Sequence, residues 1–158
     1  LVPSPNVPTY DLKPEMSCQE VAIEVINAIK NDDYKLIVVN FANGDMVGHT
    51  AVKSAIIEAM NELDKVLGEV VCEAIGANIA TLITADHGNV DEINNPKTGK
   101  PNTQHSLNPV PCVVIDNKRN WEIIKNDGGL SNITPTVLTL MGIDKPKEST
   151  SESLIKES

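Results

Sequence analysis

Apolar residues recur every three or four positions in three parts of the chain, which is the spacing of helices that bury one face. These parts cover residues 17–30, 50–75 and 134–142. Gly76 follows the second part and Gly142 closes the third, and glycine is typical of a helix C-terminus. The pattern therefore predicts three amphipathic helices.

Three other stretches are apolar throughout, without the alternation of a half-exposed strand: residues 36–42, 79–85 and 110–115. Such runs are typical of strands that are covered on both faces, as in a parallel sheet. Pro111 lies in the third run and cannot donate a ladder hydrogen bond, so this strand is expected at an edge. The order of helices and strands predicts an α/β fold with a mostly parallel sheet flanked by helices.

The chain length of 158 residues corresponds to about one domain. We expect this domain to cover residues 1–143 and a polar C-terminal tail to cover residues 144–158. The chain does not begin with Met and has one arginine, Arg119, which suggests a fragment of a longer protein. The cysteines lie far apart and lack zinc-site or redox spacing, so we interpret them as reduced core residues. They are Cys18, Cys72 and Cys112.

The formal net charge of −9 changes the set of possible partners, because a nucleic-acid backbone or an anionic membrane would repel the chain. Divalent cations would be attracted instead. No apolar run reaches the roughly 18 residues of a membrane span, and the first residues lack the features of a signal peptide. We therefore expect a cytoplasmic protein that binds neither nucleic acid nor membranes.

Histidine and aspartate residues gather where the predicted strands end. Asp45 and His49 follow the first strand, four positions apart, and Asp86 and His87 follow the second. His105 precedes the third strand, and the chain contains three histidines in all. In α/β sheets, ligands bind outside the carboxyl ends of the strands. Imidazole and carboxylate groups together suit a divalent metal such as Mn²⁺ or Zn²⁺, so these residues predict a metal site.

Each of these residues also has a simpler explanation when it is taken alone. Asp45 could cap the long helix. His105 could be a surface or packing residue, and Asp86 with His87 could form a turn. The occurrence of all histidines at strand ends favours the metal site over these alternatives.

Several stretches resemble the C-terminal part of cofactor-independent (2,3-bisphosphoglycerate-independent) phosphoglycerate mutases, which belong to the alkaline phosphatase superfamily. The matching strings, in chain order, are SPNVPTYDLKPEMS, NFANGDMVGHT, ITADHGN, QHSLNPVP and GLSNITPTVLTLMGI. The resemblance extends from Val2 to about Ile155. It implies an α/β core of the alkaline-phosphatase type, incomplete in this chain, that holds two divalent metal ions. Mn²⁺ is the expected metal, with Mg²⁺, Co²⁺ and Zn²⁺ as other candidates.

Carried over motif by motif, the resemblance implies that Asp45, His49 and His105 bind one metal ion and that Asp86 and His87 contribute to the other. It implies interconversion of 3-phosphoglycerate and 2-phosphoglycerate through a phosphoserine, in glycolysis and gluconeogenesis. The nucleophilic serine of the family lies outside this chain. We therefore expect the chain to act with the remainder of a parent chain and to be inactive alone.

Some residues depart from the family pattern or tempt a different assignment. Ala51 stands where the family usually has glycine. Ser106 follows His105, but adjacent residues of an extended segment point to opposite faces, so Ser106 is not expected to be the nucleophile. Asp91 could complete the second metal site locally.

Two alternatives to the mutase remain at the level of sequence. One is another metal-dependent phosphomutase or phosphatase of the same superfamily. The other is a non-catalytic fragment that metal stabilises.

Overall fold

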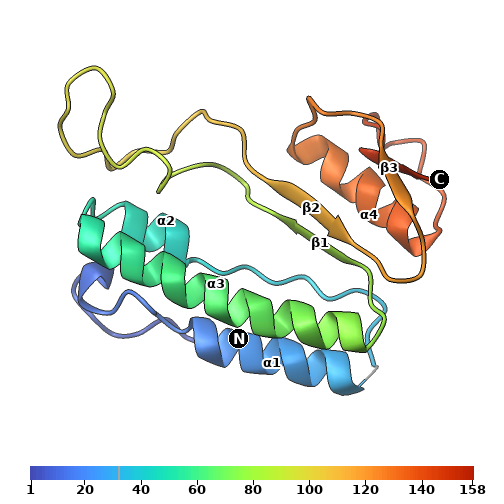
Figure 1. Ribbon diagram of the computed structural model, residues 1–158, viewed down its shortest axis with the longest axis horizontal. Helices are drawn as coiled ribbons and strands as arrows, with labels where there is room; N and C mark the ends of the chain where they lie inside the picture. Colours follow the sequence, from blue (N-terminus) through green and yellow to red (C-terminus); the bar gives the residue numbers. More distant parts are fainter. Residues whose placement is uncertain (32) are drawn as a thin grey trace.

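The computed structural model describes residues 1–31 and 33–158. Figure 1 shows that α1 and α3 lie side by side, that the β1–β2 pair lies beyond α3, and that α2 and α4 lie at opposite ends of the molecule. The elements in chain order are η1 (Tyr10–Leu12), α1 (Cys18–Asn31), α2 (Asn43–Gly48), α3 (Lys53–Gly76), β1 (Thr81–Thr84), β2 (Cys112–Ile115), β3 (Trp121–Ile123), η2 (Leu130–Asn132), α4 (Ile133–Met141) and β4 (Ile155–Glu157). Helices and strands occur together, so the predicted α/β class is confirmed. Within the described ranges, no helix combines the length and the apolar character needed to cross a membrane.

The three predicted helices are present as α1, α3 and α4. The apolar stripes of α1 and α3 face each other and form one core. Its buried members are Cys18, Ala22, Val25, Ile29, Val66, Val70 and Ala74. Burial of each Val or Ile side chain among them stabilises the fold by about 1.5–3 kcal/mol, so the periodic residues hold α1 and α3 together.

The strands pair differently from the prediction. β1 and β2 form an antiparallel ladder, in which Thr81 lies opposite Ile115 and Thr84 opposite Cys112. β3 and β4 form a second antiparallel ladder. The sequence predicts a mostly parallel sheet, but the ladders of the described residues are antiparallel. Pro111 precedes β2 directly, and β2 has β1 as its neighbour on one side, which agrees with the expected edge position.

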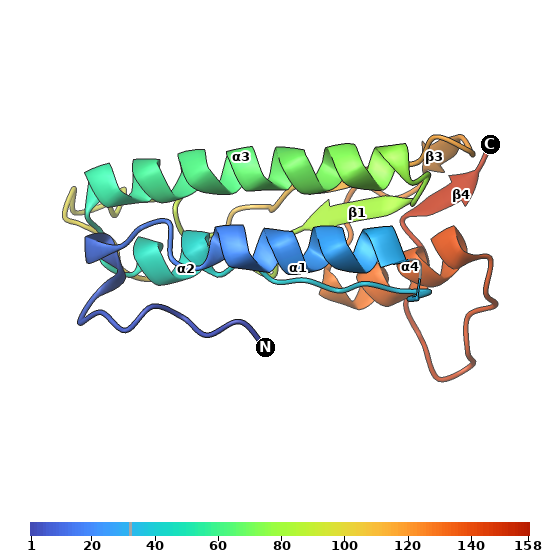
Figure 2. The ribbon, with the colours of Figure 1, turned by 90° about the horizontal axis from the view of Figure 1, so that it is seen from below.

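Residues 36–42 run as an extended trace between α1 and α2, outside any ladder of the described residues (Figure 2). The pattern predicts a buried central strand here, yet Leu36, Val38 and Val39 are exposed, Val38 to 84%. Ile37 and Phe41 pack on the α1–α3 core. One face of the expected strand is therefore covered, and the other face is open.

A short helix and a strained residue separate this segment from α3. α2 occupies Asn43–Gly48, and α3 begins at Lys53 rather than at 50. Between them, Ala51 has a φ of 53°, in the left-handed region that favours glycine. The tight turn explains why the predicted long helix starts three residues late.

The C-terminal residues from 144 onward, which the sequence presents as a polar tail, return to the fold. β4 pairs with β3, and Leu154 and Ile155 are buried against α4. These two apolar residues are surrounded by charged and polar neighbours in the sequence, so no periodic pattern marks them.

The cysteines differ in their surroundings. All three are free, as predicted. Cys18 is buried in the core, but Cys72 and Cys112 are exposed, so their assignment to the core is wrong. Cys72 lies on the solvent-exposed face of α3. Its apolar character therefore does not mark the face that the helix buries.

Candidate metal centre

α2 presents Asp45 and His49 to one side because its other side is anchored. Asn43 is 2% exposed, and its amide Nδ2 donates to two backbone carbonyls of the N-terminal loop at 2.9 and 3.0 Å. Val47 is fully buried. The backbone N–H of His49 donates to the carbonyl of Asp45 at 3.0 Å, so the two residues lie one helical turn apart on the same face.

Three side chains converge here from two distant parts of the chain. The Nε2 atoms of His49 and His105 each lie 3.1 Å from Oδ1 of Asp45. The two Nε2 atoms lie 3.3 Å apart. One ligand-type atom from each residue falls within 4.8 Å of the others, and the side chains are 34–46% exposed. An ion from solvent can therefore reach all three.

The hydrogen bond of His49 defines which of its nitrogens is free. Nδ1 lies 2.7 Å from the backbone carbonyl of Thr103, which can only accept. Nδ1 therefore carries a proton, and in the neutral imidazole Nε2 keeps the lone pair that faces Asp45 and His105. Metal-ligating histidines commonly hold the proton on the far nitrogen in this way.

Asp86 and His87 lie beside this group. Nε2 of His87 is 3.5 Å from Oδ2 of Asp86 and 3.9 Å from Oδ1 of Asp45. The rings of His87 and His105 stack with centroids 3.6 Å apart, and Nδ1 of His87 is buried without a hydrogen-bond partner. Across residues 1–31 and 33–158, Asp86 and His87 have no third ligand-type side chain of their own.

The simpler explanations can be compared with this geometry. Asp45 lies within α2, whereas the residue before α3 is Val52, so Asp45 does not cap the long helix. His105 is 46% exposed, but its Nε2 faces Asp45 rather than solvent alone. Asp86, whose side chain is 67% exposed, lies in a bend of the chain just after β1.

Burial raises the pKa of the Asp45 carboxyl, but the hydrogen bond from Asn89 and the positive charge of the three nearby histidines in their protonated form lower it more. The net pKa is below the ordinary value of an aspartate. Asp45 is therefore a carboxylate near neutral pH, as a metal ligand must be.

Three further residues support this group. Sequence reasoning did not single out Thr103 or Asn89, and it considered Asp91 only as a possible ligand of the second site. Hydrogen bonds from Asn108 and Ser106 lower the pKa of Asp91, so this residue is engaged with those two side chains. It does not join Asp86 and His87 in a three-ligand group, contrary to the possibility that it completes a second site. Amides and hydroxyls in loops follow no periodic pattern that could have marked them.

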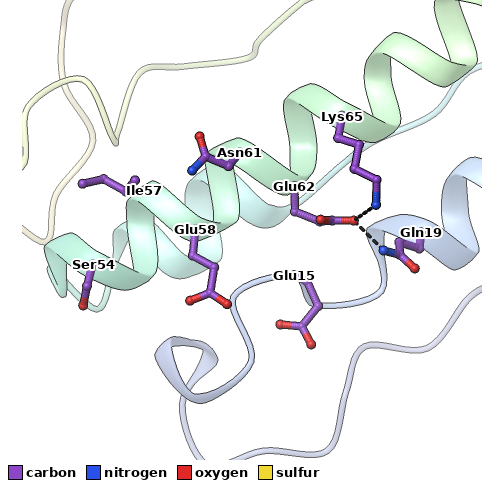
Figure 3. A pocket seen from close by; sticks show the side chains of 8 residues that line it. All are labelled: Glu15, Gln19, Ser54, Ile57, Glu58, Asn61, Glu62 and Lys65. Carbon is purple, nitrogen blue, oxygen red and sulfur yellow. Dashed lines mark hydrogen bonds and ion pairs between the residues drawn. The ribbon is translucent and has the colours of Figure 1, made fainter.

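A separate hollow lies between the start of α1 and the first half of α3 (Figure 3). Glu15, Glu58 and Glu62 line it, and Glu62 accepts hydrogen bonds from Gln19 and Lys65. The histidines do not contribute to this hollow. Glu62 thus makes ordinary surface contacts with an amide and an ammonium group.

The match to known families bears directly on the histidine cluster. A family described as the metalloenzyme superfamily matches residues 1–145. The chain belongs to the metalloenzyme superfamily. For a metalloenzyme, the cluster of Asp45, His49 and His105 is the arrangement of the described residues that fits a divalent ion.

Relatives of this metalloenzyme chain carry a common name. A protein of Symbiobacterium thermophilum named 2,3-bisphosphoglycerate-independent phosphoglycerate mutase is 48% identical over 98% of this chain and 30% of its own length. One of Methanosarcina barkeri, named 2,3-bisphosphoglycerate-independent phosphoglycerate mutase 2, is 46% identical over 98% of this chain and 29% of its own. The chain thus spans about 30% of the length of these relatives.

A solved structure is similar throughout the chain. It is a Leishmania mexicana phosphoglycerate mutase at low cobalt concentration, with a TM-score of 0.88 and 32% sequence identity. The similarity covers 99% of this chain and 31% of the other. The fold described here therefore corresponds to a part of that enzyme.

Proposed function

We propose that this chain forms the metal-binding part of a 2,3-bisphosphoglycerate-independent phosphoglycerate mutase, which interconverts 3-phosphoglycerate and 2-phosphoglycerate. The observation that carries the proposal is the convergence of Asp45, His49 and His105, in a chain whose relatives bear that name. In this proposal these three residues hold one divalent ion, and Asp86 and His87 contribute to a second.

The donor set fits such an ion. One carboxylate and two imidazoles suit a borderline divalent metal, and thiolates are not part of the cluster. The two Nε2 atoms that face each other at 3.3 Å also fit, since a shared cation would satisfy both lone pairs. We propose Mn²⁺ as the metal, and the study of the Leishmania enzyme with cobalt supports a set of similar divalent ions. Bound ions would supply charge neutralisation at the phosphoryl group and activation of a serine hydroxyl.

The serine and the substrate-binding arginines are proposed to come from the remainder of the parent chain. Ser106 is 7% exposed, and its hydroxyl donates to Asp91 at 2.7 Å. Arg119 is engaged with Asp116 and with the carbonyl of Leu140. Both candidates within this chain are therefore occupied by structural contacts.

The same remainder is proposed to cover the open face of residues 36–42. Leu36, Val38 and Val39 expose aliphatic side chains next to unpaired backbone. An extended apolar segment of this kind readily pairs with a further strand. Its covering would give residues 36–42 the second buried face that their apolar pattern predicts.

The test uses the parent chain with Mn²⁺ and follows conversion of 3-phosphoglycerate to 2-phosphoglycerate. His49→Ala is expected to abolish conversion, whereas the exposed α3 residue Asn61 offers a control, Asn61→Ala, that retains it. Pentose phosphates in place of 3-phosphoglycerate separate the mutase from related phosphomutases. Undiminished conversion by His49→Ala, or turnover of pentose phosphates alone, would contradict the proposal.

The 158-residue chain provides a second arm. It is expected to bind metal but not to convert 3-phosphoglycerate, because the hydroxyl of Ser106 is hydrogen-bonded to Asp91. Conversion by this chain alone would place the nucleophile within it and would contradict the assignment of the serine to the parent. Metal binding in the parent without any turnover would favour the non-catalytic alternative.

A further inference from the structure

We infer that Asn89 and Asp91 are positioning residues of the metal centre, which hold Asp45 and His105 in place from one loop. The inference rests on the metal-binding role proposed for Asp45, His49 and His105. Asn89 and Asp91 belong to the loop that follows β1, and their side chains bind two different segments. The loop therefore links the α2 side of the cluster to the His105 side.

Asn89 fixes the carboxylate of Asp45. Its amide Nδ2 donates to Oδ1 of Asp45 at 2.9 Å and to the backbone carbonyl of the same residue at 3.3 Å. Asn89 is 7% exposed, so these bonds lie out of solvent. The hydrogen bond holds Oδ1, the same oxygen that both histidines approach, in one orientation.

Gly48 makes this contact possible. A Cβ at position 48 would lie 2.7 Å from Cγ of Asn89, closer than such atoms approach in proteins. Because residue 48 of α2 has no side chain, Asn89 can reach Asp45. This is a specific fit and not a general property of a loop amide.

Asp91 fixes the segment that carries His105. Its Oδ2 accepts hydrogen bonds from the Ser106 hydroxyl at 2.7 Å and from the Asn108 amide at 2.6 Å. The backbone N–H of Ser106 donates to the carbonyl of Gly88 at 2.9 Å, which forms a bridge between the two segments. Because neighbouring residues of an extended segment point to opposite sides, anchoring Ser106 toward Asp91 turns His105 toward Asp45.

Gly88 is needed for this second contact as Gly48 is for the first. A Cβ at position 88 would overlap the Ser106 hydroxyl and would lie 2.8 Å from Oδ1 of Asp91. The two glycines and the two polar residues thus form matched pairs. Groups that orient metal ligands commonly change metal affinity by about 10–100-fold when they are removed.

The experiment is a titration of the 158-residue chain with Co²⁺. Visible absorption reports the affinity and, through the position and strength of the bands, the coordination geometry. Asn89→Ala and Ser106→Ala are expected to weaken binding by about 10–100-fold and to alter the spectrum at saturation. Ser106→Thr, which keeps the hydroxyl that Asp91 accepts, is expected to restore both, and Asn61→Ala is expected to match the unsubstituted chain.

Far-ultraviolet circular dichroism checks that each variant is folded. Ser106→Ala is used for Asp91 because it removes the hydrogen bond between the two residues and leaves the Asp91 carboxylate in place. If folded Asn89→Ala and Ser106→Ala chains bind Co²⁺ within about twofold of the unsubstituted chain, with its spectrum, the inference is overturned. Lower thermal stability of Ser106→Ala without a change in affinity or spectrum would overturn the role of Asp91. Failure of the unsubstituted chain to bind Co²⁺ would overturn the proposed function, and the inference with it.

Discussion

Asp45 and Asp116 are two aspartates that each collect several partners, at opposite ends of the molecule. Asp45 lies on α2 at the proposed metal centre, and Asp116 follows β2 beside α4. Both carboxyls have a pKa below the ordinary value, in spite of burial that would raise it. The nature of the partners differs between them, and that difference separates a ligand from a structural anchor.

The partners of Asp116 can only donate. Backbone N–H groups of Lys118 and Arg119 donate to Oδ1, at 2.8 and 3.4 Å. The Trp121 indole and the Arg119 guanidinium donate to Oδ2, at 2.9 and 3.2 Å. The side chain is 3% exposed, and the guanidinium also lies 4.5 Å from the centre of the Trp121 ring. Both oxygens of this carboxylate are thus occupied by hydrogen-bond donors.

The partners of Asp45 are mostly imidazole nitrogens, which can donate or accept. Only Asn89 is an obligate donor. His49 holds its proton at Thr103, and the free Nε2 faces the carboxylate. We expect a buried carboxylate that accepts from several N–H donors to stabilise the fold. We expect a carboxylate that faces the lone pairs of imidazole nitrogens to bind a cation together with them.

The strongest test of this contrast is removal of the structural carboxylate. Asp116→Ala leaves the Trp121 and Arg119 donors without their acceptor, and we expect the free energy of unfolding to fall by about 3 kcal/mol. Urea unfolding measures it. The folded variant should keep its Co²⁺ affinity, because the metal centre lies elsewhere; a large loss of affinity would contradict the contrast.

The reciprocal change is Asp45→Ala. We expect Co²⁺ affinity to fall by more than about 100-fold, beyond the usual effect of a supporting residue, because a ligand itself is lost. Equilibrium dialysis measures it. Urea unfolding without metal should show a smaller change than for Asp116→Ala. The imidazoles remain accessible to water, and the Asn89 amide keeps its hydrogen bond to the backbone carbonyl of residue 45. Strong destabilisation without metal would mean that Asp45 acts as an anchor like Asp116.

Acid should affect the two ends in different pH ranges. Asp116 has a lowered pKa in the folded state, so its contribution to stability is present above the unfolded value of about 3.9 and is lost as the pH falls through the folded value. Protons compete with metal for the ligand atoms, so Co²⁺ affinity should fall at a higher pH than the stability does. Unfolding of the chain and of Asp116→Asn, compared over pH, checks the first range. Loss of both properties in one range would contradict the separation.

The smallest expected effect concerns Arg119. Arg119→Lys keeps the charge but loses the planar group that contacts Asp116, Trp121 and the Leu140 carbonyl together. We expect a cost of about 1 kcal/mol, seen as a fall of about 2–8 °C in the unfolding temperature. Lys118→Ala, which keeps the backbone N–H that Asp116 accepts, is the control. An equal shift in both variants would show that the guanidinium has no special part.

The helices could be predicted from the sequence because their periodic apolar residues are also the residues that pack. α1 and α3 each bury the stripe that the spacing marks. Strand pairing was harder, since residues 36–42 and β1 carry similar apolar runs but only β1 finds a partner in the described part of the chain. A pattern indicates that a strand is suited to burial, and it does not indicate which chain segment covers it.

The candidate site, like the fold, could be predicted from the sequence only in part. The strand-end rule placed Asp45, His49 and His105 near one another, and their atoms do converge. The supporting roles of Asn89 and Asp91 could not be predicted, because a hydrogen bond between two segments depends on distances that only the folded chain defines.

The left-handed turn at Ala51 has a consequence for inheritance. An L-residue with a side chain pays roughly 1–2 kcal/mol in this conformation, and glycine avoids most of that cost. Alanine and glycine codons differ by a single base, so one point mutation produces Ala51→Gly. A lineage that takes this step gains a margin of stability, which lets it tolerate a damaging substitution elsewhere in the gene. The turn at Ala51 between α2 and α3, next to the proposed metal ligands, is thus a position where one substitution raises the tolerance of the protein to other mutations.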